Sequence, residues 1–552
     1  MITRNLGGEV GARGLFGGSV NRTRAAGLMV VFVVGLFLTL YGHLPGLLVS
    51  LAAGGVVVLL TARTHNGSVW SRFQRRLWWR ERLRRGLLDF RPVAERRDDM
   101  DPRLARRGRD RAQTTVAWNS FRDFPDGAPM MYWLQTDPDR PGIAWHIPPG
   151  EPAHLSVAFQ LTGAVRGIES DLFLDACSQA FGNMLARLAS PTTLPSTVQM
   201  LTRALPIDSA RHEQWVVAHS DPTAPDHLLA SYEEVLKALG HGGLTQRHYA
   251  VVRWPLTAAF IETAKRLGPG HRGWLRLMDR EVAAATRLLS GARLGRVRAL
   301  SATQTAAIIR HLQLPDWPID QLTDHGGRPW DIHVPWFASH DEWSFTSVTG
   351  QVPDRDAPPC DAGTPVTVTW HHRTAQVPIQ NVETGPRTAL WLAPLLSRMP
   401  EQVVRTLSVQ IEGVPAGIAR SGARSDLAAD IAEIESDRKK GRLTDEDAQV
   451  RLRTVRARLA DLDPGSGHQG AGWAMHLTIS ARTRQDLADA SKRVEEAADA
   501  AGITGLDWLD AHQSAAMGFT WPIARGMSPM ATTMMRFIGD QLAGTGHKEA
   551  LT

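Results

Sequence analysis

The stretch GWAMHLTISARTRQDLADASKRVEEAADAAGITGLDWL (472–509) decides the fold class of this chain. Apolar and polar residues alternate over 472–481, which predicts a β-strand. Thr483 is followed three residues later by an aspartate, a pattern that begins a helix, and Gly502 is placed to end that helix. Residues 503–509 predict a second strand. The order strand, helix, strand indicates an α+β fold.

Units of this kind build ferredoxin-like sandwiches, and similar patterns extend over most of the chain. Further strands are predicted over 130–136, 154–161, 247–254, 365–370 and 405–411. Further helices are predicted over 170–188, 227–239, 277–289 and 303–312. A mostly charged helical hairpin over 426–462, with its turn at Gly441, is expected to project from the body.

The spacing of these patterns predicts two α+β domains in a water-soluble body. The first covers 112–313 and the second covers 365–527, the latter including the charged hairpin. A connector rich in proline and tryptophan joins them over 314–364, and a tail follows over 528–552.

Two neighbouring stretches near the N-terminus contain no charged residue. They are AAGLMVVFVVGLFLTLY (25–41) and LPGLLVSLAAGGVVVLLTA (44–62). As helices they are roughly 26 and 29 Å long, near the thickness of a bilayer core. We therefore expect a two-helix transmembrane hairpin over 25–62, turning at Gly42 and His43. A cleaved signal peptide and a helical hairpin buried in a soluble core are the alternatives, but no convincing cleavage site and no polar face support them.

Arginines flank this expected hairpin on both sides. They occur in the basic segment 1–24 and again throughout 63–111. Because arginine is costly to translocate, both termini and the body are predicted to be cytoplasmic.

The segment 63–111 is expected to hold an arginine-rich juxtamembrane helix and a linker. With aromatic residues toward one side and arginines elsewhere, the helix is predicted to lie at the membrane interface and contact anionic lipid. The candidate interface residues are Arg72, Arg75, Arg76, Trp78, Trp79, Arg80, Arg82, Arg84 and Arg85. A basic helix docked on a partner subunit is the alternative.

Charge and cysteine content limit the partners of the body. Residues 1–111 hold 20 arginines and 8 acids, a net charge of +12, so the chain's total of +6 leaves −6 for residues 112–552. A net acidic body argues against direct nucleic-acid binding. Two cysteines, Cys177 and Cys360, provide neither a disulfide framework nor a cysteine-based metal site, which fits a reducing compartment.

The sequence contains no recognisable catalytic motif. The nearest approach to a phosphate-binding loop begins at Gly539, but it has Thr545 in place of the required lysine and lacks a preceding strand. His340-Asp341-Glu342 and His371-His372 are candidate ligands or acid–base groups, but neighbours in a strand face opposite sides. We therefore expect no catalytic residue, no cofactor and no metal site.

Three segments carry a resemblance to a known family. They are RHYAVVRW (247–254), RTLSVQIEGVP (405–415) before the charged hairpin, and the 472–509 unit closed by Gln513 and Phe519-Thr-Trp-Pro522. Together with the N-terminal arrangement they resemble conjugation-associated membrane proteins of high-GC Gram-positive bacteria. In that family the body is similar to the N-terminal, non-ATPase domain of the large conjugative type IV secretion ATPase.

The resemblance implies a non-enzymatic scaffold subunit at a bacterial plasma membrane. Such a subunit would bring a separately encoded ATPase and other channel subunits together, within an oligomeric complex. The accessory two-span component of a type VII secretion system is the alternative with the same layout. From another class, a membrane-tethered enzyme with scattered site residues remains open.

Overall fold

The structure is a computed structural model. It describes residues 3–6, 22–61, 63–64, 67–97, 101–103, 109–149, 151–165, 169–190, 192–206, 219, 224–240, 244–317, 337–353, 365–399, 403–439, 446–463, 465–466 and 468–527. The tail 528–552, most of the connector 314–364, the expected turn at Gly441 and the second cysteine, Cys360, lie outside these residues.

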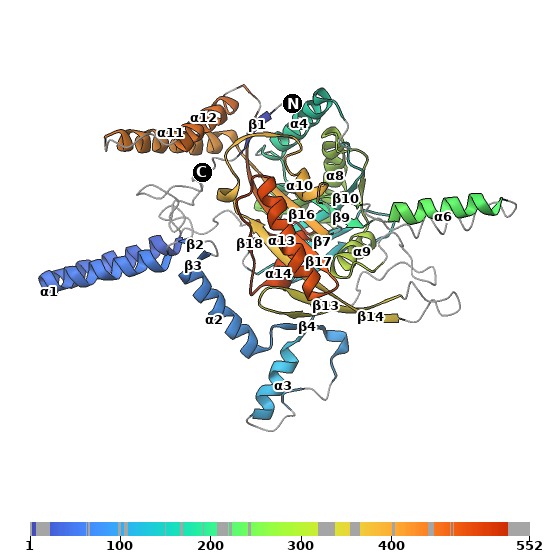
Figure 1. Ribbon diagram of the computed structural model, residues 1–552, viewed down its shortest axis with the longest axis horizontal. Coiled ribbons are helices and arrows are strands. Elements are labelled where there is room, and N and C mark those ends of the chain that lie inside the picture. Colours follow the sequence, from blue (N-terminus) through green and yellow to red (C-terminus); the bar gives the residue numbers. More distant parts are fainter. Residues whose placement is uncertain are drawn as a thin grey trace.

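One large mixed sheet of 14 strands forms the centre of the molecule (Figure 1). Its strands are β4 (Asp89–Pro92), β5 (Phe121–Arg122), β6 (Met131–Gln135), β7 (Ile143–His146), β8 (His154–Leu161), β9 (Thr197–Pro206), β10 (Leu244–Pro255), β11 (Val297–Ala299), β12 (Ala338–Asp341), β13 (Thr346–Pro353), β14 (Pro365–Val377), β16 (Val404–Val414), β17 (Gly470–Ala481) and β18 (Asp507–Trp508). They follow the order β5-β4-β12-β13-β14-β17-β16-β9-β10-β8-β7-β6, with β11 beside β8 and β18 beside β14. The expected α+β class is confirmed.

Helices cover the sheet or extend from it. They are α1 (Arg22–Thr61), α2 (Val69–Arg85), α3 (Arg109–Asn119), α4 (Asp171–Leu188), α6 (Asp226–Gly240), α7 (Ala258–Leu267), α8 (Gly270–Gly291), α9 (Ala302–Gln313), α10 (Ala393–Leu396), α11 (Ala416–Lys439), α12 (Glu446–Asp461), α13 (Arg484–Ala500) and α14 (Gln513–Met517). Two short ribbons, β1 (Thr3–Leu6) with β15 (Gly385–Thr388) and β2 (Arg63–Thr64) with β3 (Gly67–Ser68), lie outside the main sheet.

The unit predicted over 472–509 forms as β17, α13 and β18. The Thr483 hydroxyl accepts a hydrogen bond from the backbone N–H of Asp486 at 3.1 Å, and Gly502 adopts φ +74° just after the helix. β17 and β18 do not pair with each other, because β14 lies between them and pairs with both. This split arrangement joins the end of the chain to the middle of the sheet.

Strands from both expected domains belong to the same sheet. β16 pairs with β9 from Arg405 to Glu412, which places the second half of the body directly beside the first. The division into two domains remains a prediction from the sequence.

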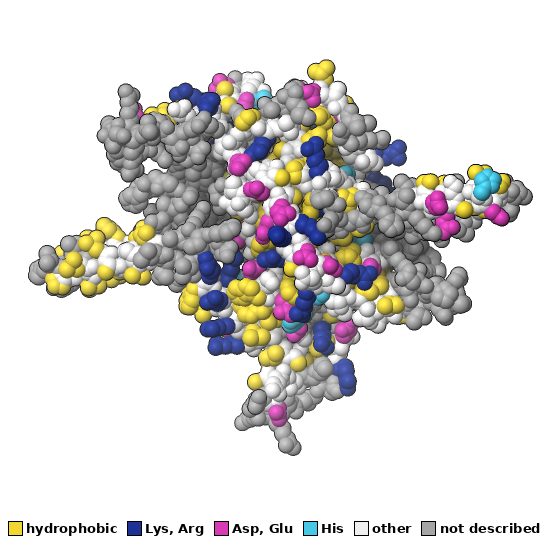
Figure 2. All heavy atoms as spheres, in the orientation of Figure 1, with side chains coloured by type: hydrophobic (Ala, Val, Ile, Leu, Met, Phe, Trp, Pro, Cys, Tyr) yellow, Lys and Arg dark blue, Asp and Glu magenta, His cyan; other side chains and the backbone are white. Residues whose placement is uncertain are grey.

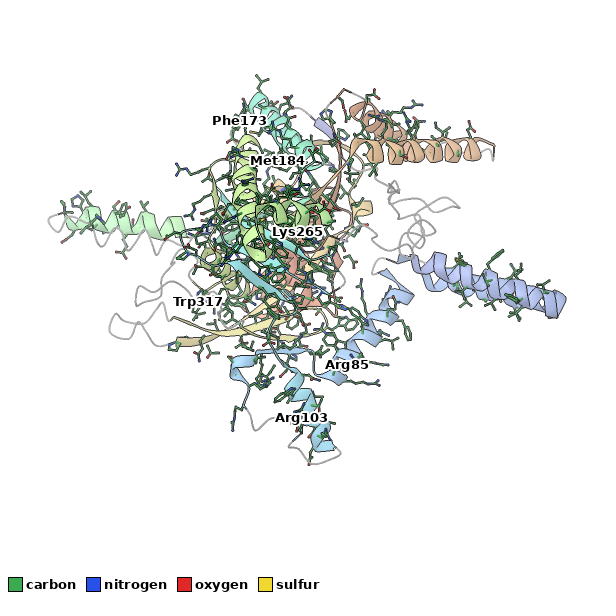
Figure 3. The ribbon with its side chains drawn as sticks, turned by 180° about the vertical axis from the view of Figure 1, so that it is seen from behind. Arg85, Arg103, Phe173, Met184, Lys265 and Trp317 are labelled. Carbon is green, nitrogen blue, oxygen red and sulfur yellow. The ribbon has the colours of Figure 1, made fainter. Side chains whose placement is uncertain are left out.

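The two faces of the sheet differ in what covers them. On one face, α4, α7 and α8 pack over β7, β8, β9 and β10, and α10 and α13 pack over β16 and β17. Figure 3 shows the molecule from behind, with Met184 on α4 and Lys265 on α7. On the other face, α9 and residues 517–524 cover a third apolar cluster that includes Leu201, Tyr249 and Trp521. The core is therefore three-layered at its centre.

The N-terminal prediction requires correction. Residues 22–61 are helical throughout and form α1. Gly27 lies against Val57 and Gly35 against Ser50, so the chain reverses direction within α1, near the turn expected at Gly42 and His43. Among the residues that the structure describes, no helix is both long enough and apolar enough to cross a membrane. The transmembrane hairpin over 25–62 and the two-span plasma-membrane localisation with cytoplasmic termini were therefore wrong.

Close packing within α1 gives a physical reason for its glycines and its lack of charged residues. A Cβ placed on Gly27 would lie 2.9 Å from the Val57 side chain, and one on Gly35 would lie 2.8 Å from the Ser50 hydroxyl. Small, uncharged residues thus let the two ends of α1 approach each other. The membrane prediction depended on the absence of charged residues. That absence is equally compatible with close packing inside α1 and with burial in lipid.

Candidate functional site

The arginine-rich helix α2 is fixed to the body along one face. Arg75, Trp78, Trp79 and Arg82 follow the spacing of one helical face, and this face contacts the sheet end and the loop before α14. Contact of the helix with a membrane interface or a partner subunit stays a prediction, and in the structure this one face packs against the body.

Arg82 makes the most extensive contact of the helix. Its guanidinium lies 2.9 Å from a carboxylate oxygen of Asp126 and 2.9 Å from one of Asp341. It also donates to the backbone oxygen of Ala511 at 3.0 Å. The side chain of Asp341 is 0% exposed and that of Arg82 is 14% exposed. Such a buried pair holds its elements in one arrangement, because separating the charges is costly.

Ser514 and the burial of Asp341 complete this contact. The Ser514 hydroxyl donates to Asp341 at 2.7 Å, and the Ser514 backbone N–H donates to the same carboxylate at 2.9 Å. Burial raises the pKa of Asp341, while the positive charge of Arg82 opposes that rise. The charge of Arg82 and the hydrogen bonds from Ser514 therefore offset part of the cost of burying this carboxylate.

Two further contacts hold the helix nearer its N-terminus. Arg75 lies 3.2 Å from Asp507 on β18 and donates to the backbone oxygen of Trp508 at 3.4 Å. The Trp78 ring lies 4.3 Å from that of His512, between centroids. Burial lowers the pKa of His512 to about 4, so this imidazole is neutral at pH 7.

The remaining candidate residues lie on the outer surface of α2. Arg72, Arg76, Arg80, Arg84 and Arg85 are exposed, and Arg85 pairs with Glu81 at 2.7 Å. In the space-filling view, dark blue side chains gather beside hydrophobic ones at the lower left, over α2 (Figure 2). Figure 3 marks Arg85 at the end of this helix.

A cleft separates the outer part of α2 from the loop after β12. It has a volume of about 360 Å³ and is lined by Arg76, Trp79, Arg80 and Trp343. The two indole rings meet edge to face, with centroids 5.6 Å apart and an angle of 76° between their planes. The backbone oxygen of Trp343 accepts a hydrogen bond from the N–H of Ala511 at 2.7 Å, which fixes this wall of the cleft.

The histidine groups singled out from the sequence do not converge. His340 contacts Asp89 at 2.6 Å, whereas Glu342 contacts Arg484 at 3.0 Å. His371 hydrogen-bonds Ser347, whereas the neighbouring His372 hydrogen-bonds Ser480 and the backbone oxygen of Gln313, each at 2.8 Å. Within the described ranges, no three histidine, cysteine or acidic side chains are grouped to hold a metal ion.

Buried polar residues that sequence reasoning missed join the C-terminal segment 511–527 to the sheet. Gln199 on β9 donates to Ser408 and to the backbone oxygens of Phe519 and Trp521, and it accepts from the N–H of Ala524 at 2.8 Å. An ion pair of 3.5 Å between Arg525 and Glu151 is a second polar contact of this segment. The alternation Thr-x-Gln-x-Leu-x-Arg over 197–203 was the available signal for β9.

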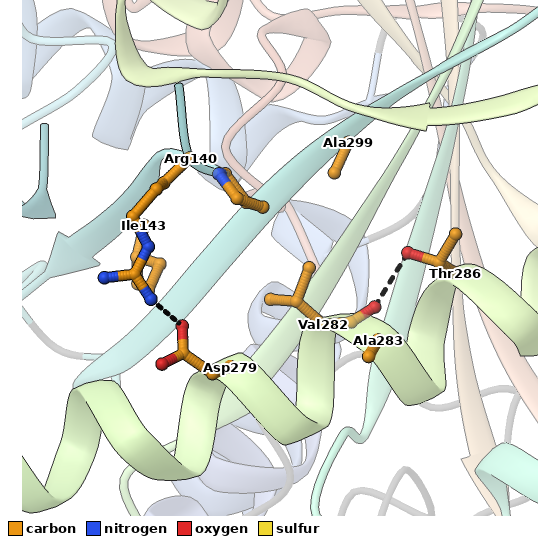
Figure 4. Close-up of a pocket in the computed structure, with 8 residues that line it drawn as sticks. Arg140, Ile143, Asp279, Val282, Ala283, Thr286 and Ala299 are labelled. Atoms are coloured by element: carbon orange, nitrogen blue, oxygen red, sulfur yellow. Dashed lines mark hydrogen bonds and ion pairs between the residues drawn. The ribbon is translucent and has the colours of Figure 1, made fainter. Parts of the chain in front are cut away.

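A second cleft lies between α8 and the end of β7 (Figure 4). Its volume is about 490 Å³, and Ile143, Val282, Ala283 and Ala299 contribute apolar lining. Arg140 and Asp279 form an ion pair of 2.7 Å at its side. Both side chains are 47% exposed, so this pair contributes little to stability.

Neither known protein-family models nor curated protein sequences match this chain. The resemblance to conjugation-associated proteins therefore has no independent support. No helix among the described residues could cross a membrane either, so assignment to a secretion or conjugation system is not supported.

Proposed function

We propose that this chain is a non-enzymatic scaffold protein, whose sheet body positions helical arms for binding to partner proteins. The arms are α1, α6 and the pair α11–α12, which extend away from the sheet in Figure 1. The body fixes where they emerge, and partner proteins supply the surfaces that they contact.

Exposed apolar side chains on these arms are the observation that carries the proposal. On α6, Leu228 is 56% exposed and Val235 is 49% exposed, and on α1 Phe32 is 71% exposed. Figure 2 shows hydrophobic side chains over much of α1. Contiguous apolar surface is unfavourable in water, and its presence on extended helices favours binding of a protein partner.

The use of charged side chains in the body also favours a scaffold. The guanidinium of Arg405 is buried and donates to the backbone oxygens of Leu395, Val403 and Leu396. Burial lowers the pKa of His372 to about 3 while both ring nitrogens are hydrogen-bonded. These groups hold elements together, which is what a rigid support requires. A separately encoded ATPase is the partner that the family resemblance implies, and it stays a prediction.

Purification of the intact, tagged protein from its native cells tests the proposal. We expect a second protein to co-purify at a fixed stoichiometry, measured by native mass spectrometry. Leu228→Ser with Val235→Ser should reduce that stoichiometry at least fivefold, whereas Arg280→Gln on α8 should leave it unchanged. Saturable nucleotide hydrolysis by the purified chain alone would support the enzyme alternative and overturn the scaffold.

A further inference from the structure

The outer face of α2 carries arginines without an acidic partner in the described part of the chain. On this helix Arg75, Arg82 and Arg85 form ion pairs, whereas Arg76, Arg80 and Arg84 form none with the described residues. These three are spaced four residues apart, so neighbouring positive charges repel and weaken the helix slightly. An anionic partner would remove this repulsion.

The helix that presents these arginines is held in place before any partner binds. Arg82 fixes its C-terminal end to Asp126 and Asp341, and Arg75 fixes its middle to Asp507. A surface that is already ordered loses less conformational entropy on binding. The outer face of α2 is therefore already ordered, as a specific docking site requires.

The cleft beside Arg76 and Arg80 adds an apolar anchor point. Trp79 and Trp343 form a corner of two indole rings, 5.6 Å between centroids, within a space of about 360 Å³. Tryptophan and arginine are the residue types that most often dominate binding energy at interfaces. A corner between rings at 76° accepts a bulky side chain more readily than a flat, stacked base.

We propose that this cleft binds an acidic segment of a partner protein. Carboxylates of the segment pair with Arg76 and Arg80, and an aromatic side chain packs against Trp79 and Trp343. Neighbouring arginines at this spacing are about 6 Å apart, which matches acids at alternate positions of an extended peptide or four apart on a helix. This inference rests on the proposed scaffold function and specifies one of its docking sites.

Fluorescence anisotropy with the full-length protein and synthetic peptides tests the site. The probe is the labelled peptide EDEWEDE, compared with EDEAEDE, with KKKWKKK and with an oligothymidylate of similar charge. We expect EDEWEDE to bind most tightly, with an affinity that falls as salt increases. Replacing its tryptophan by alanine should weaken binding about tenfold, as expected for one interface anchor.

Variants then locate the site on the protein. Arg76→Ser with Arg80→Ser should weaken EDEWEDE binding about tenfold, and Trp343→Ala should have a similar effect. Arg280→Gln serves as the matched exposed control and should not change binding. Urea midpoints equal to that of the parent protein show that each variant is folded.

The outcomes separate this inference from the scaffold function. Equal binding of EDEWEDE to the parent and to the Arg76/Arg80 variant overturns the docking site, as does tighter binding of the oligothymidylate. If that variant still co-purifies with its native partner at full stoichiometry, the scaffold function stands and this site is wrong. If the parent binds EDEWEDE as expected but purifies from native cells without a partner, the scaffold function fails.

Discussion

The guanidinium of Arg82 on α2 lies 2.9 Å from the buried carboxylate of Asp341 on β12. This ion pair joins a helix near the start of the chain to a strand in its second half. Asp126 and Ser514 contact the same pair, so four separate segments meet at one point. Attachment of α2 to the body depends on this group of charges.

Arg82→Met should therefore destabilise the protein strongly. Removing one partner of a buried pair leaves an uncompensated charge and costs about 3–5 kcal/mol. Arg84→Met, two residues later on the exposed side, should leave the urea midpoint unchanged. Urea unfolding measures both variants, and limited proteolysis should cleave residues 69–85 faster only in Arg82→Met. An unchanged midpoint for Arg82→Met would show that the pair does not hold α2.

The same variant has a pH signature. Burial raises the pKa of Asp341, so the folded protein binds a proton that the unfolded chain does not, and this favours folding as the pH falls. Without Arg82 that pKa rises further. The stability difference between Arg82→Met and the parent should therefore shrink between pH 7 and pH 5. A constant difference over this range would contradict a charge-based cause.

Two glutamines paired in register allow a second comparison. Gln199 and Gln410 are both 0% exposed and face each other across β9 and β16. Gln199 makes four hydrogen bonds, three of them to the C-terminal segment, whereas neither amide atom of Gln410 has a partner among the described residues. Their different surroundings predict different costs for the same substitution.

Gln199→Met should cost about 2–4 kcal/mol, because it leaves several buried groups of the C-terminal segment without partners. Gln410→Met should cost less than about 1 kcal/mol or stabilise the fold. Chemical denaturation measures both, and hydrogen exchange at the amide of Ala524 should accelerate only in Gln199→Met. Equal costs for the two variants would contradict the assigned hydrogen bonds.

Buried histidines predict acid sensitivity. Burial lowers the pKa of His372 to about 3 and that of His476 to about 4. Below pH 6.5 the unfolded chain binds protons that the folded chain does not, so stability falls from pH 6.5 down to these values. Each histidine should contribute a loss on the order of 1 kcal/mol by pH 5.5.

His476→Gln tests this pH dependence. In that variant the free energy of unfolding should fall about 1 kcal/mol less between pH 7.5 and pH 5.5 than in the parent. Identical slopes for the parent and for His476→Gln would show that this imidazole is accessible to protons in the folded protein.

The sequence predicted correctly those helices and strands that depend on local signals alone and need no contacts with distant segments. The segment 472–509 is such a case, because strand alternation, the Thr483 cap and Gly502 are all local signals. By contrast, β9 was missed because Gln199 and Arg203 suggest an exposed strand face, whereas in the structure both are buried. Their hydrogen-bond partners lie far away in the chain, on β16, on α9 and in residues 519–524.

The same limit applies to the candidate site. The sequence singled out Arg75 and Arg82 by composition, but their partners Asp507 and Asp341 lie far away in the chain. No spacing rule connects such residues. Trp343 likewise enters the cleft from another segment. The N-terminal error has a different origin, because a lack of charge is typical of helices in lipid but also of helices that pack closely through glycines, as α1 does at Gly27 and Gly35.

Two glycine-to-alanine substitutions test how β7 is joined to α9. A Cβ on Gly142 would overlap the backbone of Ala302 at the start of α9, and the Gly142 N–H donates to Leu300 at 2.9 Å. Backbone atoms cannot move aside as a flexible side chain can, so α9 must shift. Gly142→Ala should cost about 1–3 kcal/mol. Gly182, inside α4, has no atom within 4 Å of an added Cβ, so Gly182→Ala should stabilise the protein by roughly 0.5–1 kcal/mol. Thermal unfolding measures both, and a stabilising Gly142→Ala would contradict the close contact between β7 and α9.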